Sequence, residues 1–243
     1  MKAALRLLGL LLLAALALQL YFVGRIALMV LVDPESTAFQ RSELWQLAQA
    51  PGSRKWQQVW VPYGSLPESL KRAVIASEDA SFVEHEGVDV EALEKAWDRN
   101  AIAEKRADQT GSQLQAARRP ARIVGGSTIT QQLAKNLFLS GERTLLRKAQ
   151  ELVLTLLLEA LLDKQRILEI YLNSVEWGNG VFGAEAAARH YYRKPAARLS
   201  NYEAARLAVM LPRPRYFETR PASGYLAARA GTIAGRMPAV AVP

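Results

Sequence analysis

The longest apolar stretch of the chain lies close to its N-terminus. Residues 7–24 read LLGLLLLAALALQLYFVG, where Gln19 is the one clearly polar side chain, and a second apolar run, IALMVLV, follows Arg25. The first run approaches the roughly 20 residues that span a bilayer, and it is apolar on all faces. The pattern predicts one transmembrane helix within residues 1–32. A cleaved signal peptide is the alternative, although LALQL only loosely resembles a cleavage site.

Beyond a predicted linker at residues 33–56, apolar side chains recur mostly at helical spacing. The segment WQQVWVPY alternates over a few residues and predicts one short strand. SLPESLKRAVIASED predicts a helix in which Ser65 is the N-cap, Pro67 lies in the first turn and Glu68 follows three residues after the cap. DVEALEKAWDRNAIAEK predicts a second, amphipathic helix.

The second half of the chain carries the strongest helical patterns. GGSTITQQLAKNLFL begins in a turn and continues as a helix, and the long segment after it predicts two helices with a break near Asp163. WGNGVFG predicts a turn before another helix, and LSNYEAARLAVMLPRP predicts a helix capped by Ser200 and ended by Pro212. Residues 106–124 are basic and rich in glutamine, which predicts a mobile loop. We therefore expect residues 57–243 to form one mainly α domain.

Composition narrows the class of protein. The 243 residues include 31 Lys or Arg against 23 Asp or Glu, and this net charge of +8 favours an acidic partner such as nucleic acid, anionic lipid or a phosphorylated substrate. No cysteine is present, so disulfides and cysteine-ligated metals are excluded. Two histidines argue against a histidine-rich metal site.

Charges on either side of the apolar run predict its orientation. Lys2 and Arg6 precede the run, whereas Asp33 and Glu35 follow it. Positive charge near a span stays on the cytoplasmic side of the membrane. The N-terminus is therefore expected in the cytoplasm and the rest of the chain outside.

Acidic side chains and one histidine crowd the segment ASEDASFVEHEGVD, residues 76–89. Glu78 is the first of them and lies where an apolar helix is expected to end. A carboxyl group at such a boundary can lie half inside a pocket, with a raised pKa that suits general acid or base catalysis. The simpler interpretation is a solvated acidic turn, and no metal-binding spacing is recognisable.

A charged cluster follows in GERTLLRKAQELVLTLLLE. Arg143, Arg147 and Glu151 are spaced i, i+4 and i+8 and share one face of a helix. This could be a surface salt bridge worth a few tenths of a kcal/mol. Because the flanking LVLTLLL belongs to a core, it could also be a partly buried carboxylate that cations or a ligand keep ionised.

The string GGSTITQQLAKN, residues 125–136, gathers short polar side chains and ends near Lys135. Backbone N–H groups at a helix N-terminus bind anions, and Lys135 with Arg143 and Arg147 could hold phosphate oxygens. The spacing of a Walker A loop is absent, and taken alone the string could be a capped helix.

Four segments occur in a fixed order behind the N-terminal apolar run: EDASFVEHEGVD, GGSTITQQLAKN, RKAQELVLTLLLE and KQRILEIYLNSVEWGNGVFGAEAAARHYY. Together they resemble the peptidoglycan glycosyltransferase family, whose domain polymerises lipid II into glycan strands. The resemblance covers roughly residues 57–217, and several motifs match almost letter for letter. Since the chain ends soon afterwards, without room for a penicillin-binding transpeptidase domain, we expect a monofunctional member in the bacterial inner membrane, with a periplasmic catalytic domain.

The resemblance implies a fold and a set of residue roles. The fold is a mainly α, lysozyme-like globular domain with a smaller membrane-associated lobe, behind one N-terminal transmembrane helix. Glu78 matches the catalytic base, which deprotonates the 4-hydroxyl of the incoming lipid II, and Glu151 matches a second glutamate near the donor's diphosphate. The remaining matching positions bind substrate: Ser127 and Gln132 line the cleft, and Lys135, Arg143, Arg147 and Lys148 surround the diphosphate.

The resemblance also implies partners and leaves rivals open. Expected partners are lipid II, the growing glycan strand and the membrane, with other cell-wall or division proteins as further candidates and no nucleic acid. No tightly bound cofactor and no metal-ligand set is expected, although Mg²⁺ or Mn²⁺ could help to neutralise the diphosphate. One rival is a lytic transglycosylase or muramidase, which has no need of the cluster Lys135, Arg143 and Arg147. Another is a membrane-anchored scaffold, which would tolerate loss of Glu78.

Overall fold

Helices dominate the computed structural model, which describes residues 2–49, 56–95, 98, 101–102, 126–139, 141–142 and 144–243. The elements follow the chain in this order: α1 (Lys2–Leu28), α2 (Ala38–Gln49), β1 (Gln57–Gln58), η1 (Tyr63–Ser65), α3 (Glu68–Glu78), α5 (Ile129–Phe138), α6 (Leu145–Leu161), α7 (Lys164–Ser174), β2 (Glu176–Gly178), β3 (Val181–Phe182), α8 (Ala184–Tyr192), η2 (Ala196–Arg198), α9 (Asn201–Met210), α10 (Pro214–Glu218), α11 (Gly224–Arg236) and η3 (Met237–Ala239). The expected mainly α fold class is confirmed.

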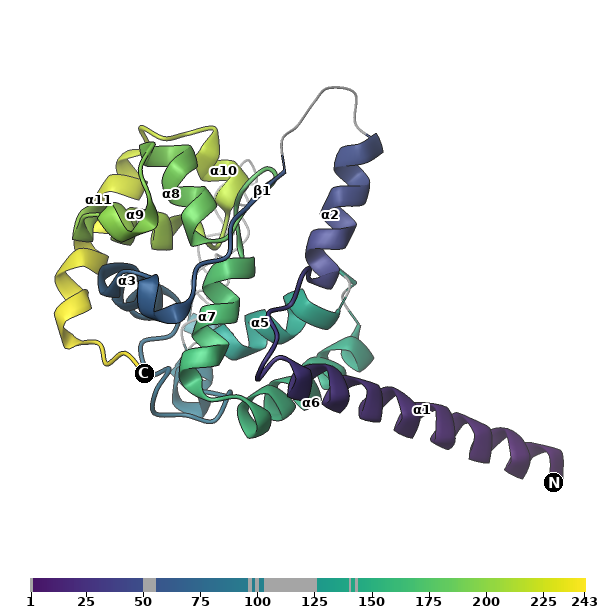
Figure 1. Ribbon diagram of the computed structural model, residues 1–243. Coiled ribbons are helices and arrows are strands. Elements are labelled where there is room, and N and C mark those ends of the chain that lie inside the picture. Colours follow the sequence, from purple (N-terminus) through teal and green to yellow (C-terminus); the bar gives the residue numbers. More distant parts are fainter. Residues whose placement is uncertain are drawn as a thin grey trace, which may run out of the picture.

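The central helix is α7, which Figure 1 shows between two groups of helices. On one side lie α3, α8, α9, α10 and α11, and on the other lie α5 and α6 (Figure 1). Ile167, Leu168, Ile170 and Tyr171 of α7 are fully buried. Because apolar side chains point from α7 toward both groups, one continuous core holds the two groups together.

Three helix starts follow the sequence prediction. Thr128 caps α5 in a capping box, where its side chain accepts the N–H of Gln131 and the Gln131 side chain accepts the N–H of Thr128. Asp163 caps α7, which places the predicted break between α6 and α7 where it was expected. Ser200 caps α9 in a second capping box.

The prediction that Ser65 caps a helix is wrong. Helix α3 begins at Glu68, and its N-cap is Pro67, which makes no side-chain capping bond. Ser65 instead ends the 3-10 turn η1, where its N–H donates to the carbonyl of Pro62. The proline fixes an extended backbone at the cap, so the helix starts two residues later than a serine cap would start it.

A small sheet joins the N-terminal part of the chain to the middle of the domain. Its strand order is β1-β3-β2, with β1 parallel and β2 antiparallel to β3. Gly183 follows β3 with φ of +81°, and a Cβ there would lie 2.7 Å from the carbonyl oxygen of Asn173. Only glycine fits this turn, which directs the chain from the sheet into α8.

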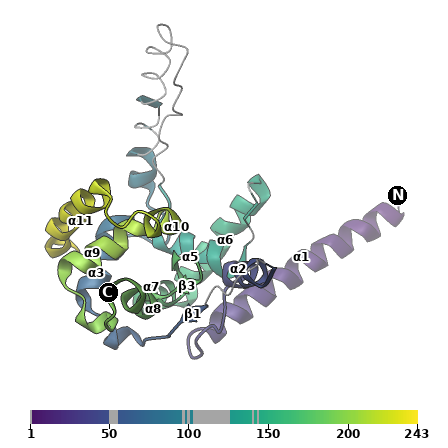
Figure 2. The ribbon, with the colours of Figure 1, turned by 90° about the horizontal axis from the view of Figure 1, so that it is seen from above.

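The N-terminal helix α1 projects away from the other helices (Figures 1 and 2). Its 27 residues are long and apolar enough to cross a membrane. Its last turns are different, because Phe22 and Ile26 are buried and belong to the same core as α5 and α7. Met29, just after the helix, is buried there as well.

Parts of the sequence prediction lie outside the described residues. These parts are Arg143 and the basic loop at residues 106–124. The predicted helix that starts near residue 90 is helical at residues 90–95. The predicted linker at residues 33–56 contains helix α2, and the domain boundaries at residues 32 and 57 stay a prediction.

Candidate active site

Glu78 is the last residue of α3, at the point where the helix opens into an acidic turn. Its carboxyl group is largely enclosed. It accepts hydrogen bonds from Ser77 Oγ at 3.3 Å and from Gln132 Nε2 at 3.1 Å. Burial raises the pKa of Glu78 above its ordinary value, and the two hydrogen bonds offset only part of that increase. The carboxyl group therefore accepts a proton more readily than an exposed glutamate does.

Gln132 connects Glu78 to the interior of the domain. Its Oε1 accepts a hydrogen bond of 2.9 Å from the hydroxyl of Tyr171, which lies in the core. Because Oε1 is occupied in this way, the amide must turn its Nε2 toward Glu78. The hydrogen bonds from Tyr171 to Gln132 and from Gln132 to Glu78 therefore fix the orientation of the carboxylate from the core side.

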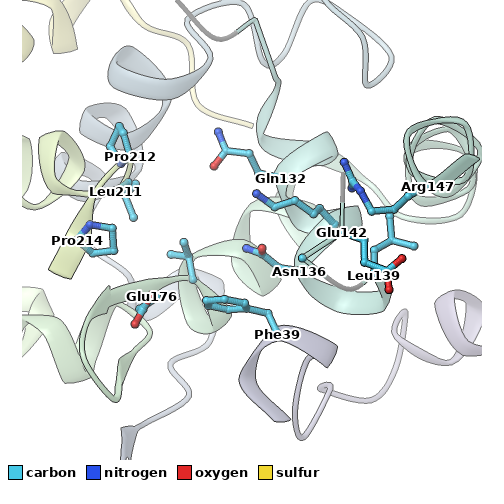
Figure 3. A pocket seen from close by; sticks show the side chains of 13 residues that line it. Phe39, Gln132, Asn136, Leu139, Glu142, Arg147, Glu176, Leu211, Pro212 and Pro214 are labelled. Carbon is cyan, nitrogen blue, oxygen red and sulfur yellow. The ribbon is translucent and has the colours of Figure 1, made fainter. Parts of the chain in front are cut away.

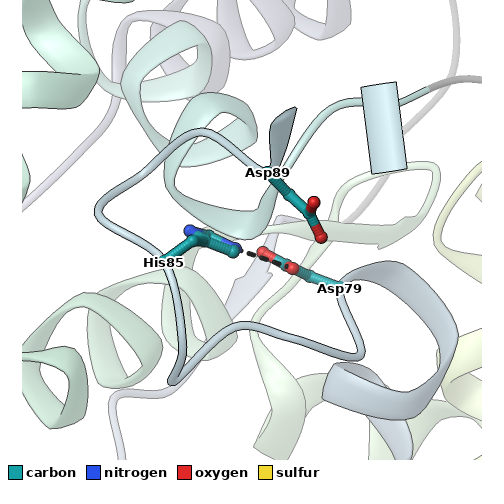
Figure 4. A group of neighbouring side chains, drawn as sticks. All are labelled: Asp79, His85 and Asp89. Carbon is teal, nitrogen blue, oxygen red and sulfur yellow. Dashed lines mark hydrogen bonds and ion pairs between the residues drawn. The ribbon is translucent and has the colours of Figure 1, made fainter. Parts of the chain in front are cut away.

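The acidic turn after Glu78 is held by Asp79, His85 and Asp89, drawn in Figure 4. Asp79 accepts from His85 Nε2 at 2.9 Å and from the N–H of Ile129 at 3.0 Å, so it joins the turn to the start of α5. His85 Nδ1 accepts the N–H of Gly87, and the Asp89 carboxylate accepts from Ser81.

These three side chains are also the one group of potential metal ligands found among the described residues, with ligand atoms within 4.8 Å of one another. Both ring nitrogens of His85 already have protein partners, and both oxygens of Asp79 are used as acceptors. A metal ion could bind His85 only by displacing Asp79 or the N–H of Gly87 from its ring. We therefore assign the trio a structural role, which is to hold the segment that carries Glu78.

A cavity of about 490 Å³ opens in front of Glu78. Ser127 and Thr128, at the start of α5, form part of its wall. Arg229 and Arg236 reach it from α11, and the charge of Arg229 favours the ionised form of Glu78, which lowers its pKa slightly against the effect of burial. The cavity thus combines Glu78 and further acidic side chains with cationic and hydroxyl groups on its walls.

A second cavity, of about 470 Å³, lies on the other side of Gln132. Gln132, Lys135 and Asn136 line it from α5, and Arg147 lines it from α6. Figure 3 shows Arg147 on one side of this cavity and Leu211, Pro212 and Pro214 on the opposite side, with Phe39 and Glu176 below. Gln132 therefore lines the second cavity while its amide touches the carboxylate of the first.

Glu151 is buried on α6 beside the second cavity, with only 5% of its side chain exposed. It accepts from Arg147 Nη1 at 2.8 Å and pairs with Lys148. Burial alone would raise the pKa of Glu151, but the hydrogen bonds from Lys148 and Arg147 outweigh burial and hold it below the ordinary value. Glu151 is thus kept ionised and serves as the anchor for two cations.

Lys135 faces the same cluster from α5. Partial removal of water lowers the pKa of Lys135, and the charges of Arg147 and Lys148 lower it further, whereas Glu151 raises it. The Nε atom of Arg147 is buried and has no hydrogen-bond partner among the residues that the structure describes. Lys135, Arg147 and Lys148 outnumber the carboxylates Glu142 and Glu151, which leaves an excess of positive charge at this end of the second cavity.

The structure therefore brings the predicted site residues into two adjoining groups. Glu78 and Ser127 line the first cavity, while Gln132, Lys135, Arg147, Lys148 and Glu151 gather at the second. Arg143 lies outside the described residues. The catalytic and substrate-binding roles of these residues stay a prediction.

Sequence reasoning missed several side chains of the site. Arg229 and Arg236 are seven residues apart on α11, so they share a face, but nothing local in the sequence directs that face toward Glu78. Tyr171 reads as an ordinary core residue of α7. Phe39 comes from the segment predicted as a linker, and its place in the second cavity depends on how α2 packs.

Comparison with known proteins identifies the family to which the chain is similar. The transglycosylase family matches residues 45–238. A protein from Burkholderia thailandensis named biosynthetic peptidoglycan transglycosylase is 54% identical over 231 residues, covering 95% of this chain and 84% of the relative. Proteins of the same name from Burkholderia pseudomallei and Burkholderia lata are 53% and 51% identical, each over 95% of this chain and over 84% and 87% of their own lengths.

Proposed function

The chain belongs to the transglycosylase family, and from that premise we propose that it polymerises lipid II into glycan strands and releases undecaprenyl diphosphate. It is a glycosyltransferase of peptidoglycan synthesis. The observation that carries the finer assignment is the position of Glu78. Burial raises its pKa, it lines one cavity, and it accepts a hydrogen bond from Gln132, which lines the second cavity together with Lys135 and Arg147.

In this proposal the cavity in front of Glu78 holds the acceptor. A base with a raised pKa takes up a proton near neutral pH more easily than an ordinary carboxylate. Glu78 removes the proton of the 4-hydroxyl of lipid II as that oxygen attacks C1 of the donor sugar. The bond between C1 and the diphosphate oxygen breaks at the same time, so negative charge grows on the leaving diphosphate while Glu78 becomes neutral.

The second cavity holds the donor diphosphate. Lys135 and Arg147 line it. The Nε of Arg147, which has no partner among the described residues, is a donor that a phosphate oxygen would satisfy. Fixed cations stabilise the leaving group more as its charge grows, which lowers the barrier rather than only tightening binding. Glu151 holds Arg147 and Lys148 in place by ion pairs, so we assign it a positioning role.

No resident cofactor is part of the proposal. Glu151 is already paired with Arg147 and Lys148, so it is not free to bind a metal ion. A Mg²⁺ or Mn²⁺ ion would therefore arrive with the diphosphate as its counter-ion. It would supply additional neutralisation of the phosphate oxygens.

The proposed location is the bacterial inner membrane, with the catalytic domain in the periplasm. Two features support it. Lys2 and Arg6 precede the apolar helix whereas Asp33 and Glu35 follow it. The end of α1 is part of the domain core, which supports an anchor that stays attached. A reporter that is active only after export, fused after Pro243, should be active, and activity of a strictly cytoplasmic reporter at that position would refute the orientation.

One experiment separates polymerisation from its nearest rival. The purified protein is incubated with labelled lipid II and, in a parallel reaction, with finished glycan polymer. We expect growth of long chains from lipid II and no release of fragments from the polymer. Fragments from polymer with no growth from lipid II would support a lytic enzyme, and no change in either substrate would support a scaffold.

A further inference from the structure

One face of the anchor helix α1 packs against the domain. Among the described residues of α1, the side chains before position 19 are exposed. From there, side chains at positions 19, 22 and 26 are partly or fully buried, at the spacing of one helix face. Phe22 packs edge-on against Phe138 of α5 with 5.3 Å between ring centroids, and Ile26 is fully buried. The anchor therefore has a docked half and a free half.

At the boundary between these halves lies a pair of glutamines. Gln19 Nε2 donates to Gln150 Oε1 at 2.9 Å, and Gln150 Nε2 donates to Gln19 Oε1 at 3.2 Å. Gln19 is the one clearly polar residue of the apolar run, and Gln150 lies on α6 directly before Glu151. Each amide satisfies the other, which is the arrangement that two polar side chains require in hydrocarbon.

The sequence of α1 places this pair below the membrane surface. The nineteen residue-to-residue steps from Arg6 to Arg25 give a rise of about 28 Å, close to the roughly 30 Å of a hydrocarbon core. Gln19 lies six residues before Arg25, which is about 9 Å along the helix axis into the leaflet on the side of the domain. The contact with Gln150 therefore brings α6 into that leaflet.

The surface of α6 fits this depth. Leu145 and Leu146 at its start are 91% and 82% exposed, and Leu152, Val153 and Leu156 are also exposed. In water these exposed apolar side chains would be unfavourable, whereas in the leaflet on the side of the domain they bury apolar area. Arg147, Lys148 and Glu151 lie on the same helix, so whatever fixes α6 in the leaflet also fixes their height.

We propose that the Gln19–Gln150 pair is a positioning contact that docks the anchor on α6 and holds the diphosphate-binding cluster at the level of the lipid headgroups. The inference rests on the proposed function, because it concerns how a diphosphate attached to a membrane lipid reaches Lys135 and Arg147. The pair does not touch the reacting atoms. It acts through α6, and its effect should depend on whether the substrate is held in a bilayer.

The test compares Gln19→Leu, Gln150→Leu and the double variant on two substrates. One substrate is full-length lipid II embedded in phospholipid vesicles, and the other is a water-soluble lipid II analogue with a short tail, assayed without membrane. Gln165→Leu makes the same side-chain change on an exposed position of α7 and is the matched control. For a cross-link, the variant Q19C/Q150C is treated with a short thiol-reactive linker in vesicles, since the chain has no other cysteine.

We expect each single variant to slow polymerisation in vesicles by about three- to tenfold, the effect of one hydrogen-bonded pair between membrane helices. The double variant should be no slower than the single variants, and all variants should match wild type on the soluble analogue. The double-cysteine variant should cross-link within one chain. Unchanged vesicle rates, equal losses on both substrates or a failed cross-link would each overturn the proposal. If wild type polymerises neither substrate while the cross-link forms, the proposed function fails and the docking contact stands.

Discussion

The hydroxyl of Tyr171 offers a sharp test of how the domain tunes Glu78. That hydroxyl donates to Gln132 Oε1 at 2.9 Å, and Gln132 Nε2 donates to Glu78 at 3.1 Å. Burial and the nearby charges of Glu78 and Asp79 raise the pKa of Tyr171 well above its ordinary value, so the hydroxyl stays protonated and remains a donor. Tyr171→Phe removes this donor and leaves the Gln132 amide free to turn away from Glu78.

The expected effect can be worked out from that geometry. The bond from Gln132 favours the ionised form of Glu78, so its loss should raise the pKa of Glu78 further. A hydrogen bond of this kind contributes about 0.5–1.5 kcal/mol, which corresponds to a shift of roughly 0.4–1.1 pH units. A base works when it is deprotonated, so the acidic limb of the pH–rate profile should move to higher pH by that amount.

The assay is the initial rate of lipid II polymerisation across the acidic limb, with Tyr191→Phe as control. Tyr191 also donates its hydroxyl inside the domain, to the carbonyl of Trp177 at 2.7 Å, but it has no contact with Gln132 or Glu78. Tyr191→Phe should leave the limb where it is. An unmoved limb in Tyr171→Phe, or one that moves to lower pH, would refute the reasoning that Gln132 relays this bond to Glu78.

Three further predictions concern stability. Because burial raises the pKa of Glu78, its charge costs folding free energy above that pKa, so Glu78→Gln should melt at a higher temperature than wild type at neutral pH. Thermal melts should show this advantage shrinking as the pH falls through the raised pKa toward the ordinary value of about 4.5. The pKa of Glu151 is lowered instead, so Glu151→Gln should reduce the unfolding free energy by about 1–3 kcal/mol at neutral pH. The difference from wild type should close as the pH falls below about 4.5, because wild type then loses the same ion pairs, and denaturant titration at several pH values checks this. Arg215 of α10 joins Glu43 of α2 to Glu176, so Arg215→Gln should speed hydrogen exchange across α2. Arg41→Gln, a change within α2 itself, should not.

Local chemistry made much of the fold predictable. Three helices begin at a side-chain cap, at Thr128, Asp163 and Ser200. Each cap accepts the backbone N–H of the residue three positions later, and such a bond depends only on neighbouring residues. Ser65 misled because a proline two positions later, rather than the serine, determined where the helix could begin. The two short strands β2 and β3 were not predicted, because strands of three and two residues are too short to show an alternating pattern.

The candidate site divides in the same way. Motifs in the sequence were enough to select Glu78, Lys135, Arg147 and Glu151, because each motif is a continuous segment. The partners that tune these residues come from elsewhere in the fold, as Tyr171 does for Gln132 and Arg229 does for Glu78. Gln19 stood out as the polar residue of an apolar run, but its partner on α6 follows only from the packing of two helices.

The most direct test of the central claim is the rate at which Glu78→Gln polymerises labelled lipid II, measured beside wild type at the same pH. The amide keeps the size of the carboxyl group and cannot take up the proton of the attacking hydroxyl. A circular dichroism spectrum and a lipid II binding isotherm on the same samples should match wild type. The rate should fall by a factor on the order of 10²–10⁴ or more. A variant that polymerises lipid II within about twofold of wild type would contradict the assignment of Glu78 as the base.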